Sequence, residues 1–385
     1  LRLARIHQRL GDEEAFCETF GSWCDREDAG AVVDDHLEHA RALHARGELG
    51  AARTRTLRAT ALAPESVDAW TLSGELARED GEASAAAESF ARAAEHEPPE
   101  RAASLRVLAA DCIAREDPER AHELLALALR DDAGSLDVHV ALTRTADALS
   151  LEEQTARHAE RALELARAGD LDGATRLELA LLGGRAAHAR SDRPATRRLF
   201  ASALEVDENH IEALERVGEA DFEDGDRRAA REPLERRLEQ GGEHPDRARH
   251  LAMVARGLED EDLLDAAWSR YEEAIEAQAD LEVAHEGLVR VHERTGRTDD
   301  ALEALERWVD ASNDDSARAT AALRAAEHAL ALDDAQRALR HLETATEVDP
   351  ILTPAWLLRC ELVADRGADH ETRRLCEAAL ESVEP

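Results

Sequence analysis

The chain has 385 residues, of which 85 are acidic and 48 basic, so its formal net charge is −37. Every basic residue is arginine, because the sequence contains no lysine. So negative a chain repels the phosphates of nucleic acid, and no apolar run approaches the roughly 20 residues that cross a bilayer. Nucleic-acid binding and membrane insertion are therefore excluded.

Helices are favoured throughout, since Ala, Leu, Arg and Glu dominate and aromatic residues make up only 3%. Successive segments of about 12 residues carry apolar side chains at i, i+3, i+4 and i+7, the pattern of an amphipathic helix. Asp117 before Pro118 predicts a capped helix start, and Thr298 before two aspartates predicts another. Pro233 lies inside a predicted helix, which it should kink or whose start it should delay.

A 34-residue pattern is clearest from Val67 to Glu100. Its landmarks stand at offsets 4, 8, 15, 20, 24, 27 and 32 of the window: Trp70, Gly74, Gly81, Ala86, Phe90, Ala93 and Pro98. Self-similarity at such a period is the signature of a repeat architecture. One unit cannot bury its apolar face alone, so neighbouring units must stack.

These landmarks resemble those of the tetratricopeptide repeat. The resemblance implies an all-α fold, a right-handed superhelical solenoid of antiparallel helix hairpins. It also implies that the small residues at offsets 8, 20 and 27 mark the closest approach of paired helices. We predict a partial leading repeat over residues 1–32, where Phe16, Phe20 and Trp23 share a helical face. About ten units follow over 33–385, starting near residues 33, 67, 102, 136, 177, 211, 245, 282, 316 and 353.

Three units are stretched. Those from residues 136, 245 and 316 align only with three extra residues each, which we place near the turn between the paired helices, where longer loops are tolerated. In the first of them, Ser150 and Glu153 form a predicted capping box, and Ala159, Leu163 and Ala166 are the expected packing positions of the second helix.

Candidate binding residues come from the resemblance, which implies a concave groove lined by the first helix of each unit. Offset 9 faces that groove in the family, and here five of ten such positions are arginine: Arg41, Arg144, Arg185, Arg290 and Arg324. A row of guanidinium groups suits carboxylates on an extended partner. The alternative is local pairing, of Arg41 with Glu38, Arg144 with Asp147, and Arg290 with Glu286 and Glu293. Apolar groove contacts are expected from Leu181, Leu182, Phe222, Leu357 and Leu358.

Other chemistry finds little support. The family's lysine-containing clamp for acidic chaperone tails is rejected, because the chain has no lysine. His36 with His39, and His285 with His292, are better explained by packing than by metal binding. We read the cysteines Cys17, Cys24, Cys360 and Cys376 as core thiols and expect no disulfide framework. No phosphate loop, nucleophile elbow or zinc-protease motif occurs, so we predict no cofactor, no metal and no catalysis.

We therefore expect a scaffold or adaptor that binds a polypeptide partner, which could carry an acidic segment, in its concave groove. The alternative is a regulatory or substrate-recruiting arm of a larger enzyme, because the chain opens with Leu1 rather than methionine and reads as a segment. A bacterial cytoplasm is the expected compartment, with the periplasm left open. The partner's identity and the oligomeric state are left open too.

Overall fold

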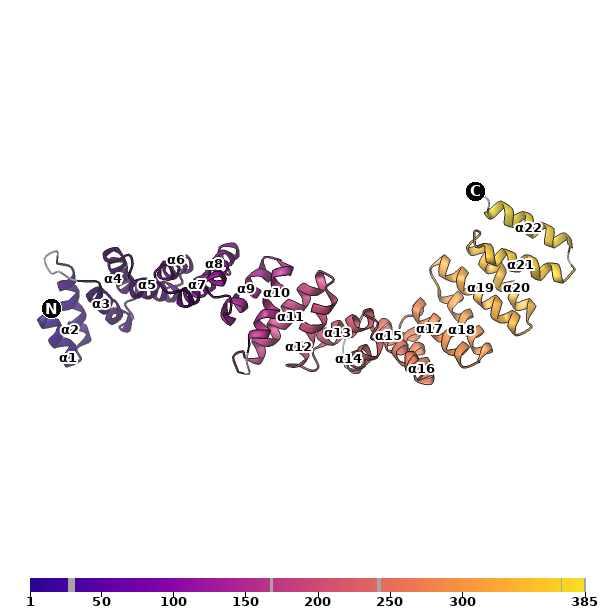
Figure 1. Cartoon of the computed structure of the whole chain (residues 1–385), viewed down its shortest axis with the longest axis horizontal. Coiled ribbons are helices and arrows are strands. Elements are labelled where there is room, and N and C mark those ends of the chain that lie inside the picture. The colour runs from indigo at the N-terminus through magenta and orange to yellow at the C-terminus, as the bar shows by residue number, and fades with distance from the viewer. Residues whose placement is uncertain (27–31, 167–168, 241–243, 368, 384–385) are drawn as a thin grey trace. The chain divides into compact units, whose positions relative to one another are not determined.

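The computed structural model describes residues 1–385 except 27–31, 167–168, 241–243, 368 and 384–385. The chain divides into two compact units, Leu1–Glu208 and Asn209–Pro385. Every regular element in the described ranges is an α-helix, and within each unit the helices follow one another as adjacent pairs (Figure 1). None of the described helices is long and apolar enough to cross a bilayer.

The first unit holds twelve helices among its described residues. They are α1 (Arg2–Leu10), α2 (Glu13–Cys24), α3 (Val33–Ala45), α4 (Leu49–Leu62), α5 (Val67–Glu79), α6 (Ala83–Ala94), α7 (Pro99–Ile113), α8 (Pro118–Asp131), α9 (Leu136–Ala148), α10 (Glu152–Leu165), α11 (Gly173–Ala189) and α12 (Arg193–Leu204). Consecutive helices pack on each other, and α7, α9 and α11 also contact in succession.

The second unit repeats this arrangement with ten helices. They are α13 (Ile211–Glu223), α14 (Arg227–Glu239), α15 (Arg247–Asp260), α16 (Leu264–Ala277), α17 (Glu282–Arg294), α18 (Thr298–Ala311), α19 (Asp315–Ala331), α20 (Ala335–Val348), α21 (Thr353–Asp365) and α22 (Asp369–Val383). Odd-numbered helices are the first of each hairpin and even-numbered ones the second. The prediction of an all-α solenoid of stacked hairpins is confirmed.

Paired helices approach where the sequence places small residues. A Cβ added to Gly74 on α5 would lie 2.8 Å from the ring of Phe90 on α6, so only glycine lets that phenyl ring fill the space between the two helices. Phe90 is 1% exposed, and Ala86 and Ala93 beside it are fully buried. The small and large landmarks thus play the packing roles expected of them.

The turn inside nearly every hairpin has one geometry. Three residues separate the helices, and the middle one has a positive φ, as Gly47, Gly81, Gly225, Gly296 and Gly367 do. Ser150, Ser191, Asp262 and Asp333 hold the same left-handed position without being glycine. Two hairpins differ, because two residues separate α1 from α2 and four separate α7 from α8. Left-handed backbone lets the second helix fold back within three residues.

This geometry corrects the predicted insertions. The turns after α9, α15 and α19 contain three residues like their neighbours, so nothing is inserted there. The extra length belongs to α19, which has 17 residues, and to the connections between hairpins. In α10 the fully packed positions are Thr155, Ala159 and Ala162, while Leu163 and Ala166 are only half-buried. In these three turns serine or aspartate stands where other turns have glycine, so the sequence pattern did not reveal where the turn lies.

The predicted helix caps were partly confirmed and partly wrong. Asp117 caps α8 as expected, accepting a hydrogen bond from the Arg120 amide at 2.9 Å. Thr298, however, is the first residue of α18 rather than its cap, and Ser150 forms no capping box because it occupies the left-handed turn. Pro233 lies well inside α14, whose start at Arg227 is not delayed. An interior proline costs about 3 kcal/mol, which tertiary packing must offset here.

Burial of the cysteines follows their place in the stack. Cys17 and Cys24 are buried as predicted, whereas Cys360 is half-buried and Cys376 is exposed. The interpretation of Cys376 as a core thiol was wrong, because α22 packs chiefly on α21 among the described helices and keeps an open face.

Two glycines of the α3–α4 hairpin give a matched test of the turn. We expect Gly47→Ala to lower the free energy of unfolding by about 1 kcal/mol, because φ is +78° and a Cβ is disfavoured there. Gly50→Ala should instead raise it by about 0.5–1 kcal/mol, because Gly50 is helical. A new Cβ meets nothing within 4 Å at either position. Urea unfolding measures both variants, and shifts of the same sign would contradict the assignment.

Candidate partner-binding site

Three arginines of the predicted row are paired, and their partners lie on a neighbouring hairpin. Arg144 on α9 donates two hydrogen bonds to Glu178 on α11, at 3.0 and 2.7 Å. Arg324 on α19 contacts Glu293 on α17 at 2.9 Å. Pairing therefore crosses between first helices, and the partners expected within one helix were mostly wrong.

Arg290 follows the same rule. Its guanidinium lies 3.3 Å from Glu259 on α15, and the expected ion pair with Glu286 is also present, at 3.9 Å. Glu38, the predicted partner of Arg41, instead accepts hydrogen bonds from Arg5 and from Gln8. Arg41 itself is exposed on α3.

The other predicted residues lie on α11 in the first unit and on α13 and α21 in the second. Arg185 is exposed on α11, where its charge acts on Asp147. Leu181 and Leu182 are half-buried on the same helix. In the second unit, Leu357 is 60% exposed, while Leu358 packs against the core. Of the predicted set, Phe222 and Arg290 line a common cavity, while Arg144 lines a separate one between α7 and α9.

That cavity, here called the Phe222 pocket, has a volume of about 360 Å³ and lies within the second unit. Its walls come from three successive first helices, α13, α15 and α17, with contributions from α14 and α16. It is lined by Phe222, Glu223, Arg227, Arg249, Ala252, Met253, Arg256, Tyr271, Val283, Glu286 and Arg290. Four arginines thus meet two glutamates and a group of apolar side chains.

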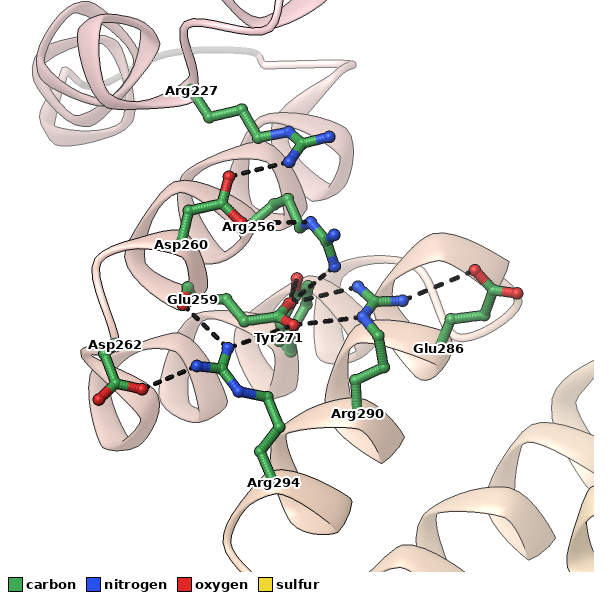
Figure 2. A network of polar contacts seen from close by, with 9 residues as sticks. All are labelled: Arg227, Arg256, Glu259, Asp260, Asp262, Tyr271, Glu286, Arg290 and Arg294. Atoms are coloured by element: carbon green, nitrogen blue, oxygen red, sulfur yellow. Dashed lines mark hydrogen bonds and ion pairs between the residues drawn. The ribbon is translucent and has the colours of Figure 1, made fainter.

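Beside the pocket lies a buried carboxylate, Glu259, whose side chain is only 5% exposed. Figure 2 shows Arg256, Arg290 and Arg294 converging on it from α15 and α17. The closest contacts of its carboxylate with guanidinium groups are 3.1 Å to Arg256 and 3.3 Å to Arg290. Arg294 also donates to the Glu259 backbone carbonyl at 3.0 Å. A buried charge is tolerated only when paired and hydrogen-bonded, and these guanidinium groups supply both conditions.

Tyr271 completes the network from α16, donating its hydroxyl to Glu259 at 3.0 Å. Burial, and after it the negative charge of Glu259, raises the pKa of Tyr271 well above its usual value. The ring lies so close to α17 that a Cβ at Gly287 would stand 2.1 Å from it. Gly287 therefore makes room for the tyrosine, and the tyrosine links the pocket to the carboxylate behind it.

Exposed apolar surface and half-exposed charged side chains border the pocket. Val283 is 52% exposed, and Phe222 is half-buried beneath the guanidinium of Arg227, 5.6 Å from the ring centre. Arg249 keeps half of its side chain exposed while contacting Glu219 at 3.3 Å and Glu223 at 3.7 Å. Such a surface can take an apolar side chain and offer a guanidinium to a neighbouring carboxylate.

Sequence reasoning missed most of this pocket, although one signal was present. Tyr271 is the only tyrosine in the chain and stands at a core position of the repeat, where Phe90 and Phe200 stand in other units. A buried phenol needs a hydrogen-bond partner, which points to a polar group in the core. Nothing in the sequence distinguished Arg249 and Arg256 as pocket residues, because arginine is common throughout this chain.

The single tyrosine makes the network measurable. We expect no tyrosinate absorbance while the protein stays folded through pH 10, the usual pKa of tyrosine, since the folded state holds the phenol neutral. The raised pKa of Tyr271 also makes the free energy of unfolding depend on pH. The contribution of the neutral phenol is complete below the unfolded pKa of about 10 and is lost as pH rises above it, because the unfolded chain then releases the proton. Ultraviolet titration alongside circular dichroism tests this, with Tyr271→Phe as the blank. Tyrosinate forming near pH 10 with helicity intact would contradict the buried contact.

No family model matches the sequence, and no curated protein does. Solved structures share parts of its architecture. The crystal structure of MamA is 19% identical, covers 43% of this chain and 94% of its own, with a TM-score of 0.38. YrrB, described as a TPR protein with an unusual peptide-binding site, is 18% identical over 53% of this chain and 98% of its own, at 0.40.

The C-terminal part of a TPR repeat-containing protein from Cytophaga hutchinsonii is 12% identical, covering 64% of this chain and 96% of its own, at 0.44. Scores this low carry no argument about function. The architecture is instead carried by the chain's own stacked hairpins, with their three-residue turns and small-residue contacts. These make the chain a tetratricopeptide-like helical-repeat protein.

Proposed function

We propose that this chain is a non-catalytic scaffold that binds a polypeptide segment, and that the Phe222 pocket is its principal contact. The observation that carries the proposal is the pocket's lining, in which apolar side chains and four arginines meet in a chain of net charge −37. Arginines cluster at this pocket although the chain as a whole is negative. Such a pocket favours a partner in which anionic groups flank an apolar side chain.

The apolar part of the pocket supplies the affinity. Val283 leaves much of its surface in water, and Phe222 and Met253 face the same cavity. Covering apolar surface is worth about 25 cal/mol per Å², so one leucine-sized side chain contributes about 1.5–3 kcal/mol. Anchors of this kind, filling a pocket between helices, dominate binding energies in most interfaces.

Arg249 supplies the orientation. Its side chain is half exposed, and its contact with Glu223 is 3.7 Å long, so a partner's carboxylate can replace that contact without opening the core. Arg256 and Arg290 are less available, because both hold the buried charge of Glu259. We expect them to keep the pocket's shape rather than to bind the partner.

In the first unit, Arg185 with Leu181 and Leu182 on α11, and separately Arg41 on α3, stay proposed further contacts. Arg144 is a weaker candidate, since two hydrogen bonds hold it to Glu178. Leu357 and Leu358 on α21, and Arg324 on α19, lie outside the Phe222 pocket, which makes Leu357 and Arg324 useful references.

The test compares substitutions inside and outside the pocket. The probe is a fluorescein-labelled peptide with one leucine between two aspartates, selected as the best binder from a set with varied flanks. We expect Val283→Asp and Arg249→Glu each to weaken binding about tenfold, equivalent to about 1.4 kcal/mol. Fluorescence anisotropy measures the affinity, and circular dichroism confirms the helices.

Matched controls are Leu357→Asp and Arg324→Glu. Leu357 is as exposed as Val283, and Arg324 contacts a glutamate as Arg249 does, yet neither lines the pocket. Both variants should bind the peptide like the unaltered protein. If they weaken binding as much as the pocket variants do, the peptide follows the arginine row or the general charge, and the pocket is not its site.

A further inference from the structure

A second polar cluster of the second unit shares no residue with the lining of the Phe222 pocket. Glu215 comes from α13, His250 from α15, and His244 from the connection that precedes α15. One ligand atom from each side chain lies within 4.8 Å of the other two. The side chain of His250 is 1% exposed and that of His244 is 5% exposed. We propose that Glu215, His244 and His250 bind a zinc ion.

The distances fit a tetrahedral ion. His244 Nε2 lies 2.8 Å from His250 Nδ1 and 3.9 Å from Glu215 Oε1. Zinc bonds of about 2.0–2.2 Å place neighbouring ligand atoms of a tetrahedron about 3.3–3.5 Å apart. The two distances bracket that value, and all three ligand atoms lie within 4.8 Å of one another, so the side chains would draw closer to surround one ion. Two histidines and a glutamate leave the fourth position for water or a partner's side chain.

The hydrogen bond to Glu219 leaves the other nitrogen of His250 for the ion. Glu219 accepts a hydrogen bond from His250 Nε2 at 3.2 Å, and His250 Nδ1 lies 2.8 Å from His244 Nε2.

The supporting groups are those that metal sites commonly have. A metal-bound histidine usually donates its second nitrogen to a carboxylate, as His250 does to Glu219. A metal-bound carboxylate is usually hydrogen-bonded in turn, and Arg237 Nε donates to Glu215 Oε1 at 2.6 Å. Nδ1 of His244 is buried without a hydrogen-bond partner, so hydrogen bonding alone does not account for this ring.

Arg237 is the main opposing influence. Its positive charge repels a dication, while its hydrogen bond holds Glu215 in place. The charges of Glu215 and Glu219 offset part of that repulsion. We therefore expect zinc to bind more weakly than at a site without a neighbouring cation, but more tightly than at exposed carboxylates, which lack imidazole ligands.

The chain offers a matched control in another histidine pair. His139 and His158 are both buried, with Nδ1 atoms 3.0 Å apart, and they are not part of a three-ligand group among the described residues. His244→Gln and His158→Gln therefore remove the same chemical group from two similar pairs. Only the first should affect a zinc ion held with Glu215.

The experiment titrates the whole chain with zinc by calorimetry and with cobalt by visible absorption, which reports tetrahedral coordination. We expect one tight site per chain, at least tenfold weaker in His244→Gln and in Glu215→Gln and unchanged in His158→Gln. Circular dichroism checks folding, and Glu215→Gln decides the matter if His244→Gln does not fold. Failure of the unaltered protein to bind one zinc ion tightly, equal binding by His244→Gln, or equal loss in His158→Gln would each overturn the site. None of these outcomes depends on peptide binding.

Discussion

Close approach of helices across alanine is the constraint on which this structure rests. Aromatic residues make up only 3% of the chain, so large rings cannot fill wide spaces between helices. The second helices instead present alanines seven residues apart, and those on α4, α6, α8, α16 and α20 are fully buried: Ala52 and Ala59, Ala86 and Ala93, Ala121 and Ala128, Ala267 and Ala274, Ala338 and Ala345. Small faces let the backbones come near, and dense packing follows from many short contacts.

The same rule explains where the molecule becomes chemically unusual. Arg237 stands on α14 where Ala59 and Ala93 stand on their helices, and it is 2% exposed. A guanidinium cannot be buried without partners, so the surrounding positions have become polar, with Glu215 at 2.6 Å and His244 beyond it. Trp308 replaces alanine at the same position on α18, and the His285 ring stacks on it with the ring centres 6.1 Å apart. Departures from the alanine pattern thus mark the places where function can reside.

Charge in this chain is organised between hairpins more than within helices. Arg144 with Glu178, Arg290 with Glu259 and Arg324 with Glu293 are separated by 31–34 residues, about one repeat. In a stack of similar units, a surface residue lies near its counterpart in the next unit, so pairs form between units as well as at i+3, where Arg256 contacts Glu259. Exposed pairs of this kind contribute at most about 1 kcal/mol each. Their larger effect is to neutralise acidic faces that would otherwise repel one another within a chain of charge −37.

The sequence predicted the helices well because periodicity reports burial directly, and Phe90 and Gly74 lie in contact as their spacing implied. Turn register was harder, because aspartate at 262 and 333 tolerates the left-handed backbone that glycine usually marks. The Phe222 pocket was largely out of reach for a different reason. Its lining combines residues from five helices, and the contact of Tyr271 with Glu259 depends on how α16 meets α15 and α17. A one-dimensional pattern records which face of a helix is buried. It does not record which buried polar groups meet there, and in this protein both candidate sites are built from such meetings.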